Sequence, residues 1–182
     1  GTTRNADYQL DAKDIMGPLD EQISEACKFV DRNMRIYAIK APNRIETPQF
    51  SMNAVFEAVV NAVAHRDYSI YGSRIRLHIF EDRLELFSPG TIPNTMTIDS
   101  LSERQSARNE LLSSLLARCP MHVNAIGSQR SYIMDKRGEG VPIIITESEK
   151  LSGEKPVYRL IDDSELMLTI FAAKPPHGEI AE

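Results

Sequence analysis

The chain contains no tryptophan and only two cysteines, and it has no hydrophobic run long enough to cross a membrane. Cys27 and Cys119 stand far apart and outside any Cys-x-x-Cys pair, which argues against a zinc site and a disulfide framework. A membrane span needs roughly 18 consecutive apolar residues, and a secretory leader needs a basic start followed by an apolar run. Because neither occurs, we expect a cytoplasmic protein with two free thiols and no membrane partner.

An excess of basic residues is also absent, because 21 lysines and arginines face 26 aspartates and glutamates and give a formal net charge of −5. Binding to a nucleic-acid backbone needs a basic surface. We therefore expect any DNA contact of the whole protein to come from segments outside this chain. The P-loop sequence Gly-x-x-x-x-Gly-Lys-Ser/Thr occurs nowhere in the chain, which excludes P-loop motor activity such as that of a helicase.

The composition that is present fits one globular domain, since 42% of the 182 residues are hydrophobic and 26% are charged. Residues 1–15 show no sustained pattern and predict a linker or a cloning remnant. Residues 16–172 carry the periodic segments of the domain, and residues 173–182 are expected to form a flexible tail.

Hydrophobic periodicity predicts the order of the elements. Helices are expected at 18–33, from a cap at Ser51 to residue 65, and at 107–119. The last helix has an apolar stripe of Leu111, Leu112, Leu115 and Leu116. Strands are expected at 34–39, 75–79, 84–88, 158–161 and 166–171. Residues 42–48 are expected to form a loop, 143–145 fit either a helix or a strand, and the polar segment 94–137 is expected to be mobile until a ligand binds. This mixture predicts an α+β two-layer sandwich, with helices on one face of a mixed, largely antiparallel sheet.

The segment from Phe56 to Tyr68 carries most of the chemical information. Glu57, Asn61 and His65 recur every four residues, so they lie on one face of the predicted helix, while Phe56 and three valines face the core. A carboxylate can act as a base and an amide oxygen can bind a hard cation, so this line suits a magnesium-bound phosphate ester and an activated water. A solvated helix face is the alternative, but the small alanines around the three polar residues favour close approach of a ligand.

Two glycine segments are further candidates. Ser88-Pro89-Gly90-Thr91-Ile92-Pro93 fits either a turn that ends a strand or a backbone wall for a planar ring. Gly138-Glu139-Gly140 fits either a loop turn or a place where backbone amides approach phosphate oxygens. In the second interpretation, Glu139 would repel a phosphate if its side chain pointed inward.

Four segments in order, EAVVNAVAHRDYS, GSRIRLHIFEDRLELFSPGTIP, SARNELLSSLL and RGEGVP, resemble the C-terminal domain of the RecG-related transcriptional regulators. This domain is a divergent branch of the GHKL ATPase superfamily, and the resemblance spans about residues 15–171. It implies the Bergerat sandwich fold, with ATP and Mg²⁺ as cofactors. It also implies an AlbA-like domain before this one, to which residues 1–15 would be the linker.

The resemblance implies roles for single residues of the predicted helix. Glu57 would be the general base for water, Asn61 would be the magnesium ligand, and His65 would be a further polar residue one turn on. The pair Arg108-Asn109 matches a recurrent Arg-Asn pair, to which the sequence assigns no role.

The resemblance places Gly90 beside the adenine, and Gly138 and Gly140 over the phosphates. Two departures from the superfamily pattern bear on this assignment. An aspartate normally binds the adenine amino group, but residues 86–91 contain no acid, and Glu139 stands between the two later glycines. We therefore expect nucleotide binding more than hydrolysis.

Two hypotheses of different class follow from the sequence. In the first, the chain is an ATP-binding, magnesium-dependent regulatory domain of a transcriptional regulator, with hydrolysis left open. In the second, it is a degenerate GHKL fold that binds no ligand and acts as a protein-interaction or dimerisation module. A homodimer is compatible with both.

Overall fold

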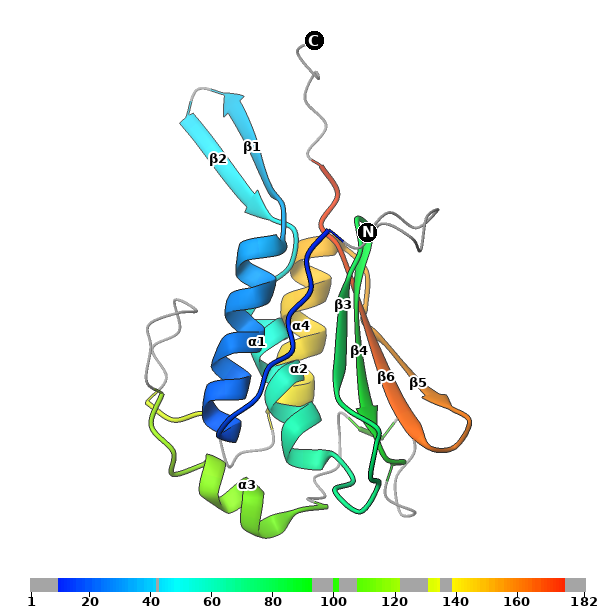
Figure 1. Cartoon of the computed structure of the whole chain (residues 1–182). Coiled ribbons are helices and arrows are strands. Elements are labelled where there is room, and N and C mark those ends of the chain that lie inside the picture. Colours follow the sequence, from blue (N-terminus) through cyan, green and yellow to red (C-terminus); the bar gives the residue numbers. More distant parts are fainter. Residues whose placement is uncertain are drawn as a thin grey trace.

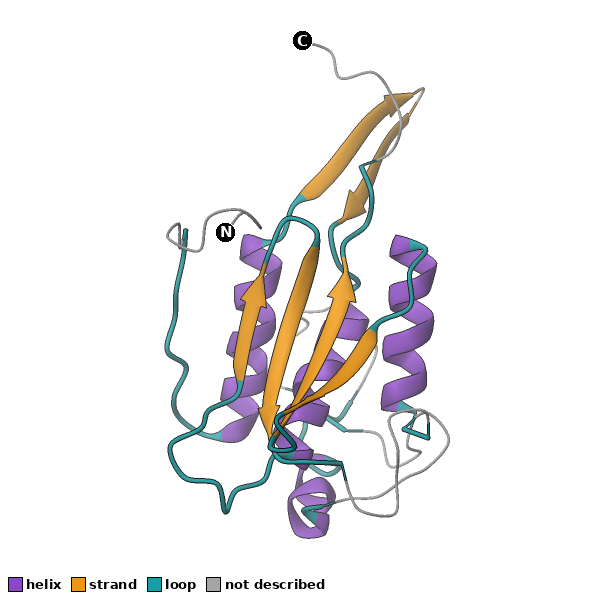
Figure 2. Cartoon of the chain, turned by 90° about the vertical axis from the view of Figure 1, so that its right-hand side faces the viewer, coloured by secondary structure: helices purple, strands orange, loops and turns teal. Residues whose placement is uncertain are grey.

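The computed structural model describes residues 10–41, 43–92, 100–101, 108–121, 131–134 and 139–175. Three helices pack on one face of a four-stranded antiparallel sheet (Figures 1 and 2). The helices are α1 (Leu19–Asn33), α2 (Met52–His65) and α4 (Gly140–Ser152), and the strands are β3 (Arg76–Ile79), β4 (Arg83–Pro89), β5 (Val157–Ile161) and β6 (Glu165–Phe171). This arrangement confirms the predicted α+β two-layer sandwich.

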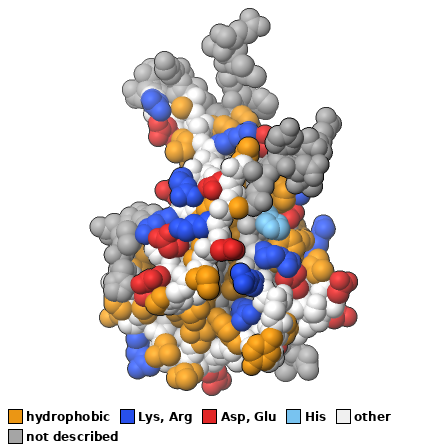
Figure 3. Space-filling view, in the orientation of Figure 1, with side chains coloured by type: hydrophobic (Ala, Val, Ile, Leu, Met, Phe, Trp, Pro, Cys, Tyr) orange, Lys and Arg blue, Asp and Glu red, His pale blue; other side chains and the backbone are white. Residues whose placement is uncertain are grey.

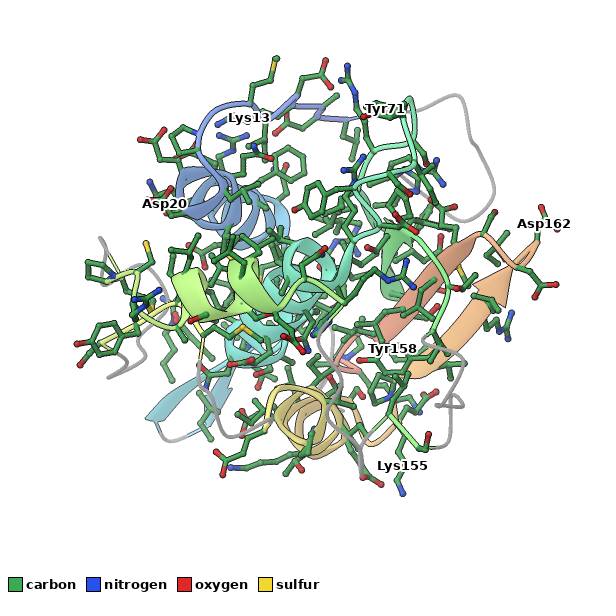
Figure 4. The ribbon with its side chains drawn as sticks, turned by 90° about the horizontal axis from the view of Figure 1, so that it is seen from below. Lys13, Asp20, Tyr71, Lys155, Tyr158 and Asp162 are labelled. Carbon is green, nitrogen blue, oxygen red and sulfur yellow. The ribbon has the colours of Figure 1, made fainter. Side chains whose placement is uncertain are left out.

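The sheet has the strand order β3-β4-β6-β5, and every neighbouring pair is antiparallel. Alternate residues of each strand point to opposite faces, and the buried Leu84, Leu86, Leu168 and Ile170 lie on the face that meets the helices. Tyr158 of β5 pairs with Leu168 and so belongs to this face, beside the end-on helices in the view from below (Figure 4). Burial raises the pKa of its hydroxyl.

Two further elements lie outside the sandwich. A short helix, α3 (Glu110–Leu116), lies near the C-terminal end of α2, and β1 (Ile36–Ala41) pairs with β2 (Asn43–Pro48) in a hairpin that projects from the opposite end (Figure 1). None of the described helices is long and apolar enough to span a membrane.

The central helix α2 is buried on nearly every side. It packs against α1 on one flank, α4 on the other and β4 beneath. Ser51 caps its start by accepting a hydrogen bond from the Ala54 amide, as predicted. The sequence predicted one apolar and one polar side, but Glu57 on the polar side is also buried, which excludes the solvated-face interpretation for this residue.

Three sequence predictions need correction or completion. Residues 43–48, expected as a loop, form β2, because Ile45 and Thr47 favour a strand and Pro48 is tolerated at a strand end. Residues 143–145, left open, are helical in α4. The helix expected at 107–119 is shorter, and Leu111 and Leu115 of its predicted apolar stripe are exposed, since α3 lies at the margin of the core. Most of the segment 94–137 lies outside the described residues.

Candidate functional site

Glu57 and Asn61 meet the first residue of α4. A Cβ added to Gly140 would lie 2.9 Å from Asn61 Nδ2, 3.0 Å from Glu57 Oε2 and 3.2 Å from Asn61 Oδ1. Real Cβ atoms are rarely this close to other heavy atoms. Glycine is therefore the residue that lets the start of α4 approach the two polar side chains of α2.

The start of α4 contributes a helix N-terminus to this contact. A helix N-terminus carries a partial positive charge and up to four amide groups without partners inside the helix. Proline has no N–H, so Pro142 supplies no donor, and the Ile143 amide donates to the Glu139 carbonyl at 2.9 Å. Gly140 and Val141 are the residues before Pro142 in this first turn that carry an N–H. Glu139, the residue before α4, is exposed.

His65, the last residue of α2, lies at the other end of the polar line. Burial and the nearby positive charge of Arg108 lower the pKa of its imidazole. The ring is consequently neutral at pH 7 and can both donate and accept a hydrogen bond. Two helical turns, about 12 Å at 1.5 Å per residue, separate it from Glu57.

Gly90 follows directly on the end of β4, where it lies close to two other segments of the chain. A Cβ at this position would lie 2.5 Å from Arg108 Nη1 and 2.9 Å from Asp67 Cβ, and its φ is +118°. The Gly90 amide donates to the Ser164 carbonyl at 2.8 Å, and the neighbouring Pro89 carbonyl accepts from the Asp67 amide at 2.8 Å. The glycine thus lets the end of β4 pack against the loop that follows α2.

That loop is held by an Asp67-centred network. Asp67 Oδ1 accepts from the amide of Ser69 at 3.0 Å and from its hydroxyl at 2.6 Å, and Oδ2 accepts from Arg108 Nη1 at 2.9 Å. Arg108 Nη2 also donates to the Thr91 carbonyl. The Ser69 hydrogen bonds, followed by the nearby arginines, lower the pKa of Asp67.

Asn109 completes the C-terminal end of α2. Its side-chain amide donates to the carbonyls of Ala64 and Arg66, both at 2.9 Å. The last carbonyls of a helix have no partner within the helix, so Asn109 satisfies two groups that would otherwise need water. The sequence singled out the Arg108-Asn109 pair without a role, and the structure supplies one: Arg108 binds the loop after α2, and Asn109 caps the helix.

The structure therefore divides the predicted site residues. Glu57, Asn61 and Gly140 come together, His65 and Gly90 both neighbour Arg108, and Gly138 lies outside the described residues. Among the described residues there is no cluster of three or more His, Cys, Asp or Glu side chains that could hold a metal ion. Magnesium commonly takes only one or two protein ligands and completes its shell with phosphates and water, so the Asn61 oxygen fits that role.

An α+β two-layer sandwich domain is the class that this fold defines. Residues 72–170 match the family described as "Putative ATP-dependent DNA helicase recG C-terminal", and the match covers more than half of the chain. The chain belongs to this family. The matched range begins after α2, so Glu57, Asn61 and His65 lie outside it.

One solved structure with a similar fold is the crystal structure of the DIP2311 protein from Corynebacterium diphtheriae. The two share 23% identity at a TM-score of 0.69, over 85% of this chain and 30% of that one. A likeness at this identity concerns the fold alone, and this chain spans less than a third of that protein. No curated protein matches the chain.

Proposed function

We propose that this domain binds magnesium ATP where α2 meets the start of α4, as the regulatory domain of a transcriptional regulator. The observation that carries the proposal is the close approach of Gly140 to Glu57 and Asn61. A carboxylate, an amide oxygen and a helix N-terminus are gathered around a backbone without a Cβ. These are the groups that recognise a magnesium-bound phosphate chain.

Each residue has a distinct role in this proposal. Asn61 would hold the cation through Oδ1, and the Gly140 and Val141 amides would face phosphate oxygens. When bound, magnesium would neutralise phosphate charge. Glu57, which is 4% exposed, would orient water or accept its proton. Pro142 removes one amide donor from the first turn, so we expect modest affinity and slow hydrolysis or none.

The base would be recognised with little selectivity. The residues at the end of β4 include no acid between 86 and 91, and Asp67, which lies beside Gly90, already accepts hydrogen bonds on both oxygens. We therefore assign Asp67 to the structure rather than to adenine. His65 and Gly90 would lie near the base, and Gly138 with Gly140 would cover the phosphates.

A ligand-free interaction module is the second candidate, and one observation favours it. Glu57 is almost fully buried beneath Gly140, and Glu139, the N-cap residue of α4, makes no side-chain capping hydrogen bond. In this account Glu57 and Asn61 only complete the start of α4. Their substitution would then lower the stability of the protein without affecting any ligand.

Calorimetric titration separates the two candidates. We expect saturable binding of Mg-ATP, weaker binding of ATP when magnesium is chelated, and little preference for ATP over GTP. Asn61→Ala should remove the magnesium-dependent part of the nucleotide affinity. Asn53 is an exposed asparagine on the same helix, and Asn53→Ala should leave that part intact. No heat of binding in the folded wild-type protein would contradict the proposal and leave the interaction module.

A further inference from the structure

The β1–β2 hairpin is an arm that stands away from the sandwich. In Figures 1 and 2 it projects beyond the ends of the helices and the sheet. The two strands pair over six residues each, and among the described elements their main packing partner is each other. An isolated two-stranded hairpin is only marginally stable in water, and more strands or a covering element are needed for independent stability.

The base of this arm is nevertheless fixed. Gln49, which is 1% exposed, donates through its side-chain amide to the carbonyls of Phe80 and Glu81 and accepts from the Arg35 amide, each at 2.9 Å. Its backbone groups bond to Arg35 and Ala173, both at 2.8 Å. Arg35 also forms an ion pair with Glu81 at 2.7 Å. The buried amide therefore holds the hairpin in one direction relative to the sheet, and this lowers the entropic cost of using the arm for binding.

The free edge of β2 carries a regular charge pattern. Arg44 and Glu46 are exposed on one face of the strand and form an ion pair at 2.7 Å, while Ile45 between them points to the other face and is 58% exposed. Basic, acidic and hydrophobic side chains are visible together on the projecting hairpin (Figure 3). Protected edge strands usually repel other strands, often through lysines. Here the two charges are of opposite sign.

This pattern is complementary to itself. If two β2 strands pair antiparallel about a two-fold axis through Ile45, each Arg44 lies directly opposite the partner's Glu46, and the two isoleucines meet on the other face. A shift of the register by two residues would place Arg44 opposite the partner's Arg44 or Glu46 opposite the partner's Glu46, which is unfavourable. A shift by one residue would place the charged face of one strand beside the Ile45 face of the other, so that Arg44 would lie opposite the partner's Ile45. The charges therefore select a single register.

We propose that this chain pairs with a second copy of itself through β2, so that two hairpins form one four-stranded antiparallel sheet centred on Ile45. The second copy supplies the neighbouring strand that a lone hairpin lacks. The two in-chain ion pairs are exchanged for two ion pairs between the copies. This association does not depend on nucleotide binding and is independent of the proposed function.

Charge exchange at the edge tests the proposal. In sedimentation velocity over a concentration series, the wild-type chain should show a reversible monomer–dimer equilibrium. Arg44→Glu and Glu46→Arg, each alone, should place two like-charged pairs opposite one another and weaken self-association by roughly tenfold or more. An equimolar mixture of the two variants should restore it, because every pair is then opposite in sign, and so should the double variant Arg44→Glu/Glu46→Arg.

Circular dichroism of each variant establishes that the sandwich remains folded, which is expected because both side chains are exposed and distant from the core. The proposal is overturned if the wild-type chain remains monomeric at its highest soluble concentration. It is equally overturned if the single variants associate as tightly as the wild type, or if their mixture gains nothing over either variant alone.

Discussion

Arg108 and Asp67 form an ion pair that ties the start of the α3 segment to the loop after α2. The Nη1–Oδ2 distance is 2.9 Å, and both side chains are largely shielded, with exposed fractions of 20% and 30%. Gly90 packs against this pair, and the positive charge of Arg108 contributes to the lowered pKa of His65. One ion pair therefore connects three of the motifs that the sequence singled out.

Gly140→Ala should weaken magnesium-nucleotide binding by about tenfold or more, equivalent to ~1.4 kcal/mol. The new Cβ would crowd Asn61 and Glu57, whose atoms begin 2.9 Å away, and would separate the start of α4 from α2. Calorimetric titration measures the loss. Thr146→Ala, at an exposed position of the same helix, is the control. If Gly140→Ala bound magnesium nucleotide as tightly as the wild type, the contact between Gly140 and α2 would not be part of the nucleotide site.

Gly90→Ala should destabilise the fold by about 2–4 kcal/mol, because it combines a strained positive φ with steric overlap at Arg108 and Asp67. Gly72→Ala is a matched control: its φ of +83° is also positive, but a Cβ there meets nothing within 4 Å. It should cost only the backbone strain, about 1–2 kcal/mol. Urea unfolding of both variants gives the difference, and equal costs would mean that the packing around Gly90 contributes nothing.

Gln49→Leu should lower the free energy of unfolding by about 2–4 kcal/mol, since it leaves buried backbone groups at Arg35, Phe80 and Glu81 without their hydrogen bonds. Gln22→Leu removes a glutamine whose side chain, among the described residues, donates to the Gly17 carbonyl alone, and this change should cost far less. Chemical denaturation provides the comparison. Faster hydrogen exchange in β1 and β2 of Gln49→Leu would show that the arm has lost its anchor.

His65 should make the stability depend on pH. Its pKa in the folded state lies below the ordinary value of 6.5, so the unfolded chain binds the proton more readily. The contribution of His65 to the free energy of unfolding is therefore fully present above pH 6.5. It decreases as the pH drops below 6.5 and levels off once the pH is below the folded-state pKa. Urea unfolding of the wild type and His65→Gln at several pH values measures the difference. A variant with the same pH dependence as the wild type would contradict the assignment, whereas Arg108→Gln should raise the pKa of His65 in an NMR titration.

Much of the fold could be predicted from local patterns. Helical spacing located α1 and α2, and alternation located the β3–β4 and β5–β6 hairpins, because in each of them one side faces the core. The β2 strand was missed because Pro42 and Pro48 flank it and because, among the described elements, β1 is its main packing partner. Its partner β1 supports it, and pairing between strands is not visible in a local pattern.

The site was predictable only in part. Four-residue spacing placed Glu57 and Asn61 on one face, but the sequence could not show that Gly140, some eighty residues later, packs against them. Gly90 was noticed for its turn, yet its close partners, Asp67 and Arg108, come from two other segments. Such contacts arise from the topology of the chain, and only the arrangement of the elements in space reveals them.

A thermal-shift titration with Mg-ATP tests the central claim most directly. If the site binds nucleotide, a hundredfold excess over the dissociation constant should add about 2.7 kcal/mol of stability, and the unfolding midpoint should rise by roughly 5–10 °C. The rise should disappear in Asn61→Ala and persist in Asn53→Ala. No rise in the wild type, or an equal rise in Asn61→Ala, would contradict a nucleotide site between α2 and α4.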